Sequence, residues 1–282
     1  MLKQRVITAL VLLAVLLPAL FAPVAAPFMA LTLALMAAAA WEWARLNGLK
    51  REAAIATGLL CAALCAGLWL GGVATWPLAP LWLAAGACWI VGGAWLLRGG
   101  VAGWPRVPLA VRWLAGLAAL VVAWLAMAQA HGMGVNFLLS VMALVWVADI
   151  CAYFAGRALG GKLTRGAKLA RSISPGKSWE GVAGGMAGVL LLAACWMAFD
   201  DPARPSLYTL LHRAGPLWLA LGALLLAAMS VVGDLVESLV KRSAGMKDSS
   251  GLLPGHGGVL DRIDALLPTL PLALALWALA VG

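Results

Sequence analysis

Residues 216–240 read PLWLALGALLLAAMSVVGDLVESLV, an apolar run of 25 residues. A helix of that length extends about 37 Å at 1.5 Å per residue, more than the roughly 30 Å hydrocarbon core of a bilayer. The run carries two charged side chains, Asp234 and Glu237, and Lys241 follows it directly. It therefore predicts a transmembrane helix with ionisable groups near one end.

The rest of the chain repeats this apolar pattern. Of its 282 residues, 64% are hydrophobic and 11% charged, against roughly 45–50% and 25% in soluble domains, which excludes a water-soluble enzyme. Apolar runs of membrane-spanning type cover residues 6–20, 24–44, 53–73, 78–97, 109–130, 135–155, 179–199, 216–240 and 263–281. An open strand in lipid would leave its backbone groups unsatisfied. The predicted fold is therefore all-α, a polytopic membrane protein with about nine transmembrane helices.

Basic residues indicate the orientation of these helices. If successive connections alternate across the membrane, 18 of the 20 Lys and Arg fall on one side. They are Lys3, Arg5, Arg45, Lys50, Arg51, Arg98, Arg106, Arg112, Arg157, Lys162, Arg165, Lys168, Arg171, Lys177, Lys241, Arg242, Lys247 and Arg262. The positive-inside rule then places the N-terminus in the cytoplasm. The excess of basic residues behind the net charge of +9 is therefore explained by membrane orientation, and no nucleic-acid partner is expected.

Polar chemistry is concentrated in the second half of the chain. We divide it into residues 1–130, a scaffold of helices 1–5, and residues 131–282, a catalytic part with cytoplasmic connections 157–178 and 241–262. The first apolar run has an alternative interpretation as a cleaved signal peptide, which leaves the remaining topology unchanged. In the scaffold, Glu42 beside Arg45 is expected to form an interfacial ion pair.

Seven of the eleven acidic residues fall on the predicted cytoplasmic half between positions 149 and 264: Asp149, Glu180, Asp234, Glu237, Asp248, Asp261 and Asp264. Asp234 precedes Lys241 by seven residues and Asp149 precedes Arg157 by eight, which places them about 10 and 12 Å deep. A charge at that depth is costly unless it faces water, a cation or a partner. Both are candidates for function, with a buried structural ion pair as the alternative.

Two helices are expected to bring carboxylates together. Ser230, Asp234, Glu237, Ser238 and Lys241 recur at intervals of three and four, so they share one helix face. Asp261 and Asp264 are three residues apart at the start of the last helix. We predict that Asp234 and Asp261 converge at the cytoplasmic mouth of a cavity. Hard oxygen ligands beside cations suit Mg²⁺ with a polyphosphate better than zinc.

Two further segments have competing interpretations. The connection 157–178 holds six basic residues and no acidic one; it either only orients the protein or, through RSISPGKS at 171–178, also holds phosphate oxygens. His256, flanked by glycines, either binds phosphate, orients a metal-bound carboxylate or shapes the turn. Gly181, Gly184, Gly185 and Gly188 predict a close helix crossing or a dimer contact.

These residues resemble a known family. The run Ser238-Leu-Val-Lys241-Arg242-x4-Lys247-Asp248-x5-Pro254-x-His256-Gly257-Gly258-x2-Asp261-Arg262-x-Asp264 is similar to the signature of phosphatidate cytidylyltransferases, also called CDP-diacylglycerol synthases. Similar segments are Asp149-x2-Ala152-Tyr153-x2-Gly156-Arg157, Ser174-Pro175-x-Lys177-x-Trp179-Glu180-Gly181 and Gly233-Asp234-x2-Glu237-Ser238. The resemblance covers about residues 140–270, whereas the first 130 residues share only length and hydropathy with the family.

The resemblance implies an enzyme of phospholipid biosynthesis that joins CTP and phosphatidic acid into CDP-diacylglycerol and releases pyrophosphate. It implies Mg²⁺, K⁺ as a second cation, and Asp234 and Asp261 as the metal ligands. It also implies a homodimer among the membrane lipids of the bacterial cytoplasmic membrane, with its active site facing the cytoplasm.

The expected mechanism is in-line attack of a lipid phosphate oxygen on the α-phosphorus of CTP, which depends on positioning and electrostatics. The predicted catalytic residues are Asp234, Asp261, Lys241 and Asp264. The predicted nucleotide-binding residues are Lys177, Ser174, Lys241, Arg242, Lys247, His256 and Arg262. For Asp149, Glu237 and Asp248 the sequence leaves two roles open, support of the metal ligands or lining of the cavity.

Two other functions compete with this one. A CDP-alcohol phosphatidyltransferase would carry several aspartates in one helical motif, DG-x2-AR…G-x3-D-x3-D, which is missing from this sequence. A cation or phosphate transporter would use the buried carboxylates as a pathway, but transporters commonly bind their substrate near the bilayer midplane between broken helices. Ion flux in liposomes without CTP-dependent turnover would favour the transporter.

Overall fold

The computed structural model describes residues 2–281. Within that range the long helices are α1 (Leu2–Leu20), α2 (Ala26–Leu46), α3 (Arg51–Leu70), α4 (Ala79–Gly103), α5 (Leu109–Met133), α6 (Val135–Leu159), α7 (Trp179–Ala198), α9 (Pro216–Ser243) and α11 (Leu266–Val281). Eight segments are long and apolar enough to span a membrane, and residues 4–20 form a shorter apolar helix. The predicted all-α polytopic class is confirmed.

Short elements lie between these helices. They are η1 (Val73–Thr75), η2 (Trp104–Arg106), strands β1 (Lys168–Ala170) and β2 (Ser174–Ser178), α8 (Leu207–Arg213) and α10 (Leu260–Ile263). The sequence predicted only loop where β1, β2 and α8 occur. The two strands form an antiparallel hairpin in which Lys168 faces Ser178 and Ala170 faces Ser174.

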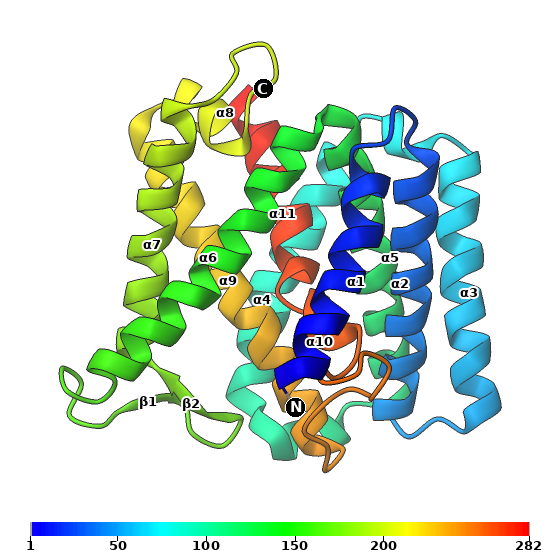
Figure 1. Ribbon diagram of the computed structural model, residues 1–282. Helices are drawn as coiled ribbons and strands as arrows, with labels where there is room; N and C mark the ends of the chain where they lie inside the picture. Colours follow the sequence, from blue (N-terminus) through cyan, green and yellow to red (C-terminus); the bar gives the residue numbers. More distant parts are fainter. Residues whose placement is uncertain (1, 282) are drawn as a thin grey trace.

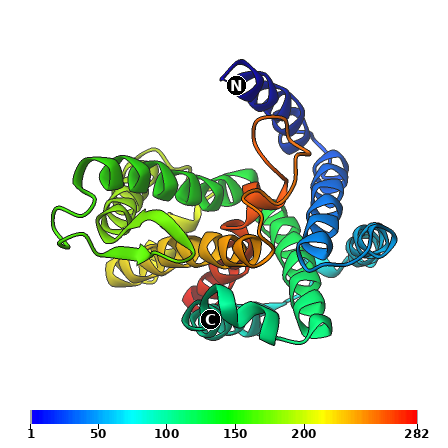
Figure 2. The same ribbon diagram turned by 90° about the horizontal axis from the view of Figure 1, so that it is seen from below.

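The helices form a bundle with α9 and α11 inside it (Figure 1). These two are the most buried of the candidate spans. Helices α2 and α3 pack against each other on one flank and α6 and α7 on the other, as both views show (Figures 1 and 2). The functional residues of α9 therefore lie between the two halves of the chain.

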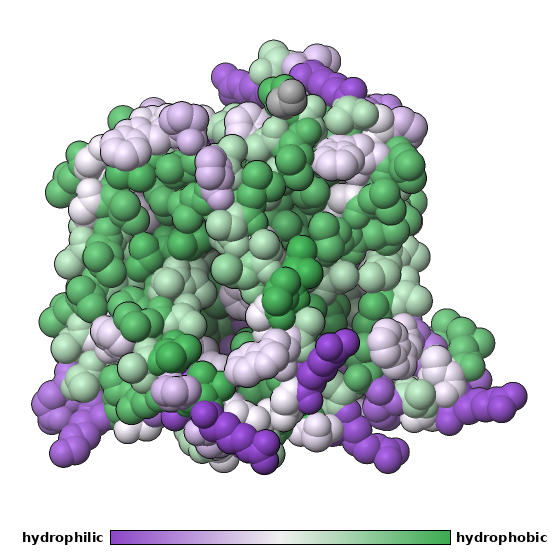
Figure 3. Space-filling model, turned by 180° about the vertical axis from the view of Figure 1, so that it is seen from behind, coloured by the Kyte–Doolittle hydropathy of each residue, from purple (hydrophilic) through white to green (hydrophobic). Residues whose placement is uncertain are grey.

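On the face shown in Figure 3, an apolar band crosses the bundle, and hydrophilic residues gather at its two ends. The end at which the chain begins also carries the α2–α3, α4–α5, α6–α7 and α9–α10 connections, which together with the adjoining helix ends hold most of the basic residues. We call this end the basic side. The pattern is that of a membrane protein whose apolar surface faces lipid.

Helices α6 and α7 cross closely because glycines face α6. A Cβ atom added at Gly184 would lie 2.2 Å from Ala155 Cβ, and one at Gly188 would lie 2.4 Å from Cys151 Sγ. Both distances are far below van der Waals contact. The small residues of 181–188 thus form the close helix crossing that the sequence predicted as one of two possibilities.

The last transmembrane segment is broken at Asp264, one residue after its predicted start at Ile263. Pro268 has no N–H to donate to the Asp264 carbonyl, four residues earlier, and its ring crowds that position in a regular helix. The carbonyl accepts a longer bond from Leu267 N instead (3.3 Å). The break separates α10 from α11, so α10 is oriented independently of the long helix that follows it.

Candidate active site

An ion pair between Asp234 and Lys177 lies at the basic side of α9. Lys177 Nζ is 2.7 Å from Asp234 Oδ2, and the side chains are 25% and 30% exposed. Asp234 Oδ1 accepts a hydrogen bond from Ser238 Oγ, one turn further along α9 (3.1 Å). Because both charged side chains are partly open to solvent, a polar ligand can reach them.

Lys241 contacts two carboxylates in a drier environment. Its ammonium group lies against Glu237, one turn earlier on α9, and 2.5 Å from Asp261 Oδ1 on α10. The Lys241 side chain is 12% exposed, and those of Glu237 and Asp261 are 3% and 5% exposed. Lys241 therefore joins α9 to the short helix that carries Asp261.

The second oxygen of Asp261 is fully engaged by the α9–α10 connection. Oδ2 accepts hydrogen bonds from Ser249 N (2.9 Å), Ser249 Oγ (2.8 Å) and Gly258 N (2.7 Å). A Cβ atom at Gly257, whose φ is +81°, would lie only 2.7 Å from the same oxygen. The glycines of the connection thus allow its backbone to wrap around the carboxylate.

Three further charged residues surround Asp234. Asp149 on α6 and Asp264 at the α10–α11 break lie close enough for their charges to act on that of Asp234. Arg262 lies close enough to act on Asp149 in the same way. The cluster is made of the carboxylates Asp149, Asp234, Glu237, Asp261 and Asp264 and of the cations Lys177, Lys241 and Arg262. Its excess of carboxylates attracts a further cation.

The hairpin holds Lys177 in place. Ser178 is the last residue of β2 and the N-cap of α7. Its Oγ accepts a hydrogen bond from Gly181 N (3.1 Å). Glu180, which is buried, accepts hydrogen bonds from Thr164 N (2.9 Å) and Thr164 Oγ1 (2.7 Å). The basic connection is thereby tied to the first turn of α7, and Lys177 extends from it to α9.

Other residues predicted to bind the nucleotide lie outside this cluster. Arg242 in the last turn of α9 and Lys247 on the α9–α10 connection are exposed. Asp248, for which support of the metal ligands or lining of the cavity was predicted, is exposed on the same connection. Ser174 lies at the far end of β2 from Ser178, and His256 is half-buried with an Nδ1 that has no hydrogen-bond partner within the described residues. The structure pairs Lys177 with Asp234 and Lys241 with Asp261, and it leaves these five residues at the periphery.

The sequence predicted an ion pair between Glu42 and Arg45, and this prediction is wrong. Arg45 stacks over the Trp41 ring, with its guanidinium carbon 4.6 Å from the ring centroid. Glu42 is completely buried and points instead to the α9–α10 connection, where it accepts hydrogen bonds from Val259 N (3.0 Å) and Leu260 N (2.7 Å). Spacing on one helix favoured Arg45, but the partners of Glu42 are backbone groups far away in the sequence.

An apolar cavity of about 530 Å³ opens beside the charged cluster. Its walls come mainly from α4 and α5, with Trp43 from α2 and Leu267 from α11. On α9 it reaches Gly233, Val236 and Glu237. An apolar chain in this cavity would therefore have its end next to charged groups.

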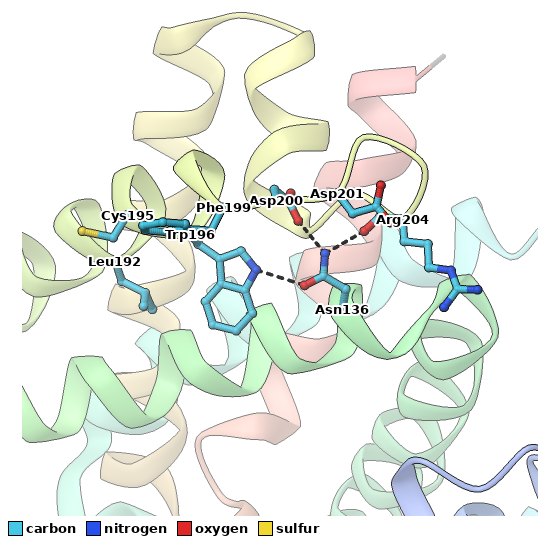
Figure 4. A pocket seen from close by; sticks show the side chains of 8 residues that line it. All are labelled: Asn136, Leu192, Cys195, Trp196, Phe199, Asp200, Asp201 and Arg204. Carbon is cyan, nitrogen blue, oxygen red and sulfur yellow. Dashed lines mark hydrogen bonds between the residues drawn. The ribbon is translucent and has the colours of Figure 1, made fainter.

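A second depression, of about 570 Å³, lies at the opposite end of the bundle (Figure 4). Asn136 donates to Asp200 and to the Arg204 carbonyl oxygen and accepts from Trp196 Nε1 (3.0 Å). These bonds fasten the α7–α8 connection to α6. The depression lies on the side away from Asp234 and has no part in the cluster.

Asp200 is the centre of that fastening. It accepts hydrogen bonds from Ser206 N (2.8 Å) and Ser206 Oγ (2.6 Å) and from Thr209 Oγ1. Burial raises the pKa of Asp200, but the hydrogen bonds from Ser206, Thr209 and Asn136 favour the carboxylate more strongly and hold the pKa below its usual value.

The cluster fits an ion that arrives with its own ligands. Among the residues that the structure describes, no three His, Cys, Asp or Glu side chains are arranged as a metal cage. Mg²⁺ is usually bound by one or two carboxylates together with phosphate oxygens and water. Asp234 and Asp261 each hold a lysine on one oxygen, so an incoming cation would exchange with an ammonium group that could then pair with phosphate.

Comparison with known proteins agrees with this chemistry. Residues 3–280 match the family model described as the cytidylyltransferase family. A protein of Pseudomonas aeruginosa named phosphatidate cytidylyltransferase is 41% identical over 290 residues, covering 100% of this chain and 99% of its own. Proteins of the same name from Haemophilus influenzae and Bacillus subtilis are 47% and 38% identical over 138 and 146 residues. These two matches cover 49% and 52% of this chain and 44% and 49% of the relatives.

Proposed function

The chain belongs to the cytidylyltransferase family, and we propose that it transfers CMP from CTP to phosphatidic acid, giving CDP-diacylglycerol and pyrophosphate. One observation carries the proposal: the pairs Lys177–Asp234 and Lys241–Asp261 adjoin an apolar cavity at the same end of α9. A nucleoside triphosphate needs the charged groups and a lipid needs the cavity. The site offers both within one turn of helix.

The reaction exchanges one phosphoanhydride bond for another. A phosphate oxygen of phosphatidic acid forms a bond to the α-phosphorus of CTP, and the bond from that phosphorus to the bridging oxygen of the β-phosphate breaks. Pyrophosphate leaves with the electron pair. Such a step gains most from alignment of the two phosphates and from neutralisation of their charge, so it needs no nucleophile from the protein.

The residues of the cluster divide these tasks. Lys177 and Lys241 move from their carboxylates to phosphate oxygens when nucleotide enters. Asp234 and Asp261 would hold Mg²⁺, which would supply positive charge to the phosphates. Asp264 and Arg262 complete the set beside Asp234. K⁺ as a second cation, and contacts of the peripheral residues with CTP, stay predictions from the sequence.

The apolar cavity takes the acyl part of the lipid. It lies between α4 and α5 and ends at Glu237, within one turn of Asp234. Phosphatidic acid that enters from the surrounding lipid would bring its phosphate to the charged cluster while its chains stay in apolar surroundings. This arrangement lets one substrate arrive from the membrane and the other from water.

The positive-inside rule supports a cytoplasmic location for the basic side, and therefore for the site. Relatives from bacteria support the bacterial cytoplasmic membrane as its location. Assembly as a homodimer stays a prediction from the family resemblance, to be measured by light scattering on the detergent-solubilised protein.

The activity is tested with purified protein in detergent, labelled CTP, phosphatidic acid and Mg²⁺. We expect labelled CDP-diacylglycerol and stoichiometric pyrophosphate from the wild type. Asp234→Asn and Asp261→Asn each remove a charge from the cluster, so turnover should fall by about 100-fold or more. Asp201→Asn removes an exposed charge at the opposite end of the bundle and serves as the matched control.

Each variant is first checked for monodisperse elution and helical circular dichroism. A folded Asp234→Asn or Asp261→Asn protein with wild-type turnover would contradict the roles assigned to these aspartates. A folded wild type that moves ions across liposomes but forms no labelled lipid would contradict the function itself.

A further inference from the structure

Glu42 is a buried carboxylate that the mechanism above does not use. It lies on α2 with no exposed surface. Within the described residues it takes part in no ion pair with a Lys or Arg side chain. A buried charge without a cation must be stabilised by hydrogen bonds, and four donors lie within hydrogen-bond distance of Glu42.

The four donors all come from the α9–α10 connection. Oε1 accepts from Ser250 Oγ (2.5 Å) and Val259 N, and Oε2 accepts from Leu260 N. Oε2 also lies 3.1 Å from Ser249 Oγ, whose single hydroxyl proton is shared with Asp261. Ser249 and Ser250 lie near the start of the connection, and Val259 and Leu260 at its end. One carboxylate therefore holds both ends of the segment 249–260 together.

The same segment builds the surroundings of Asp261. Ser249 and Gly258 donate to Asp261 Oδ2, and Ser249 Oγ also lies within hydrogen-bond distance of Glu42. A Cβ atom at Gly258 would lie 2.0 Å from Ser249 Oγ and 2.4 Å from Glu42 Oε1. The two carboxylates thus share one layer of donors, with Gly258 leaving room between them.

Glu42 also satisfies the start of α10. The first N–H groups of a helix have no partner inside the helix, and here Val259 N and Leu260 N donate to Glu42. Asp261 follows directly in the chain. The position of its carboxylate relative to Lys241 is therefore set from α2, in the other half of the molecule.

We propose that Glu42 is a positioning residue, which fixes the segment 249–260 so that Asp261 faces Lys241 and the incoming nucleotide. This role rests on the proposed function, because Asp261 must itself matter for cytidylyl transfer. Glu42 acts through the connection and touches no substrate. Loss of the Glu42 carboxylate should displace Asp261 and leave Lys177 and Lys241 on their own elements.

The test compares Glu42→Gln with Glu52→Gln. Glutamine has nearly the shape of glutamate but one acceptor oxygen, so its NH₂ group would face two of the four donors. Glu52 is exposed at the start of α3 and loses the same charge in the control. A third variant, Ser250→Ala, removes one donor to Glu42 that has no contact with Asp261.

We expect Glu42→Gln to lower kcat by about 10- to 100-fold, the usual effect of losing a group that orients a metal ligand. The Mg²⁺ concentration for half-maximal rate should rise, because Asp261 is no longer held in place. Ser250→Ala should have the same effects to a smaller degree, and Glu52→Gln should match the wild type.

Hydrogen exchange without substrate or metal gives a readout independent of turnover. Amides of residues 249–262 should exchange faster in Glu42→Gln, while those of α6 and α7 keep the wild-type rate. Exchange and kinetics like the wild type would overturn the proposal. So would faster exchange in all helices with an unchanged Mg²⁺ requirement, which is the result of a general loss of stability.

The two proposals can fail separately. If the wild type forms no CDP-diacylglycerol, the proposed function fails, whatever Glu42 does. If the wild type is active and Asp261→Asn is not, but Glu42→Gln keeps full activity and full protection of 249–262, only the role of Glu42 is refuted.

Discussion

Removal of the Lys241 ammonium group should destabilise the protein through Glu237. In Lys241→Met, Asp261 still receives three hydrogen bonds from Ser249 and Gly258. Glu237 has no such support, because its side chain is 3% exposed and its oxygens accept no other hydrogen bond from the described residues. The substitution therefore leaves a buried carboxyl group without a partner.

The expected loss is about 3–5 kcal/mol in the free energy of unfolding, the range for breaking a buried ion pair by removing one partner. Adding Glu237→Gln removes the unpaired carboxyl group. The double variant should recover the larger part of the loss, because a neutral amide is much cheaper to bury than a carboxylate. Lys50→Met, at an exposed lysine on the same side, controls for the loss of a positive charge.

Equilibrium unfolding in mixed micelles of denaturing detergent measures the stability of the wild type and the three variants, and labelled CTP measures their turnover. If Lys241 binds phosphate, turnover stays low in the double variant although stability returns. Equal stability of Lys241→Met and wild type would refute the pairing with Glu237. Recovery of turnover together with stability would refute a direct role of Lys241 in transfer.

Three further predictions address packing, lipid access and pH. Gly184→Leu should destabilise the protein by about 1–3 kcal/mol or more in the same unfolding assay, because even its Cβ collides with Ala155, whereas Gly67→Leu, with open space around it, should be neutral. Gly92 lines the apolar cavity, and a Cβ atom added there has no neighbouring atom within 4 Å, so Gly92→Phe places a ring in the cavity. This variant should raise KM for long-chain phosphatidic acid by roughly 10-fold, or about 1.4 kcal/mol, whereas the control Gly67→Phe should not. An equal rise in the KM for CTP would argue against a lipid path. Asp200→Asn should lower Tm at neutral pH. Because the Asp200 pKa is depressed in the folded state, the Tm difference from the wild type should shrink as pH falls below the usual aspartate pKa of about 3.9. A Tm difference that stays constant with pH would contradict hydrogen bonds that depend on the Asp200 charge.

The sequence predicted the long helices well because each is a long apolar run, most of them with basic residues near the end that lies at the basic side. It also predicted that Asp234, Glu237 and Lys241 share a face, which follows from helical spacing alone. The break at Asp264 had a local signal that was not used, Pro268 four residues later. Patterns within one helix are therefore readable without any knowledge of the fold.

Contacts between segments were not readable in the same way. Lys177 was predicted to bind phosphate, but nothing in the basic connection indicated that a hairpin carries it to Asp234. Glu42 has partners 207–218 residues away, and two of them are backbone N–H groups. Nearly every residue has such a group, so the sequence does not mark which ones will pair. The one local clue for Glu42 was a carboxylate in an apolar helix, and the neighbouring Arg45 gave that clue a simpler explanation.

The contacts of Glu42 give the first half of the chain a part in arranging the site. Carboxylates of the second half supply the charge at the site, yet the segment that presents Asp261 is held by α2, and the cavity beside Glu237 is walled by α4 and α5. Movement of the first half relative to α9 would therefore alter both the lipid space and the setting of Asp261. The proposed lipid space and the setting of Asp261 both depend on helices of the first half, so occupancy of the cavity should slow hydrogen exchange in 249–262.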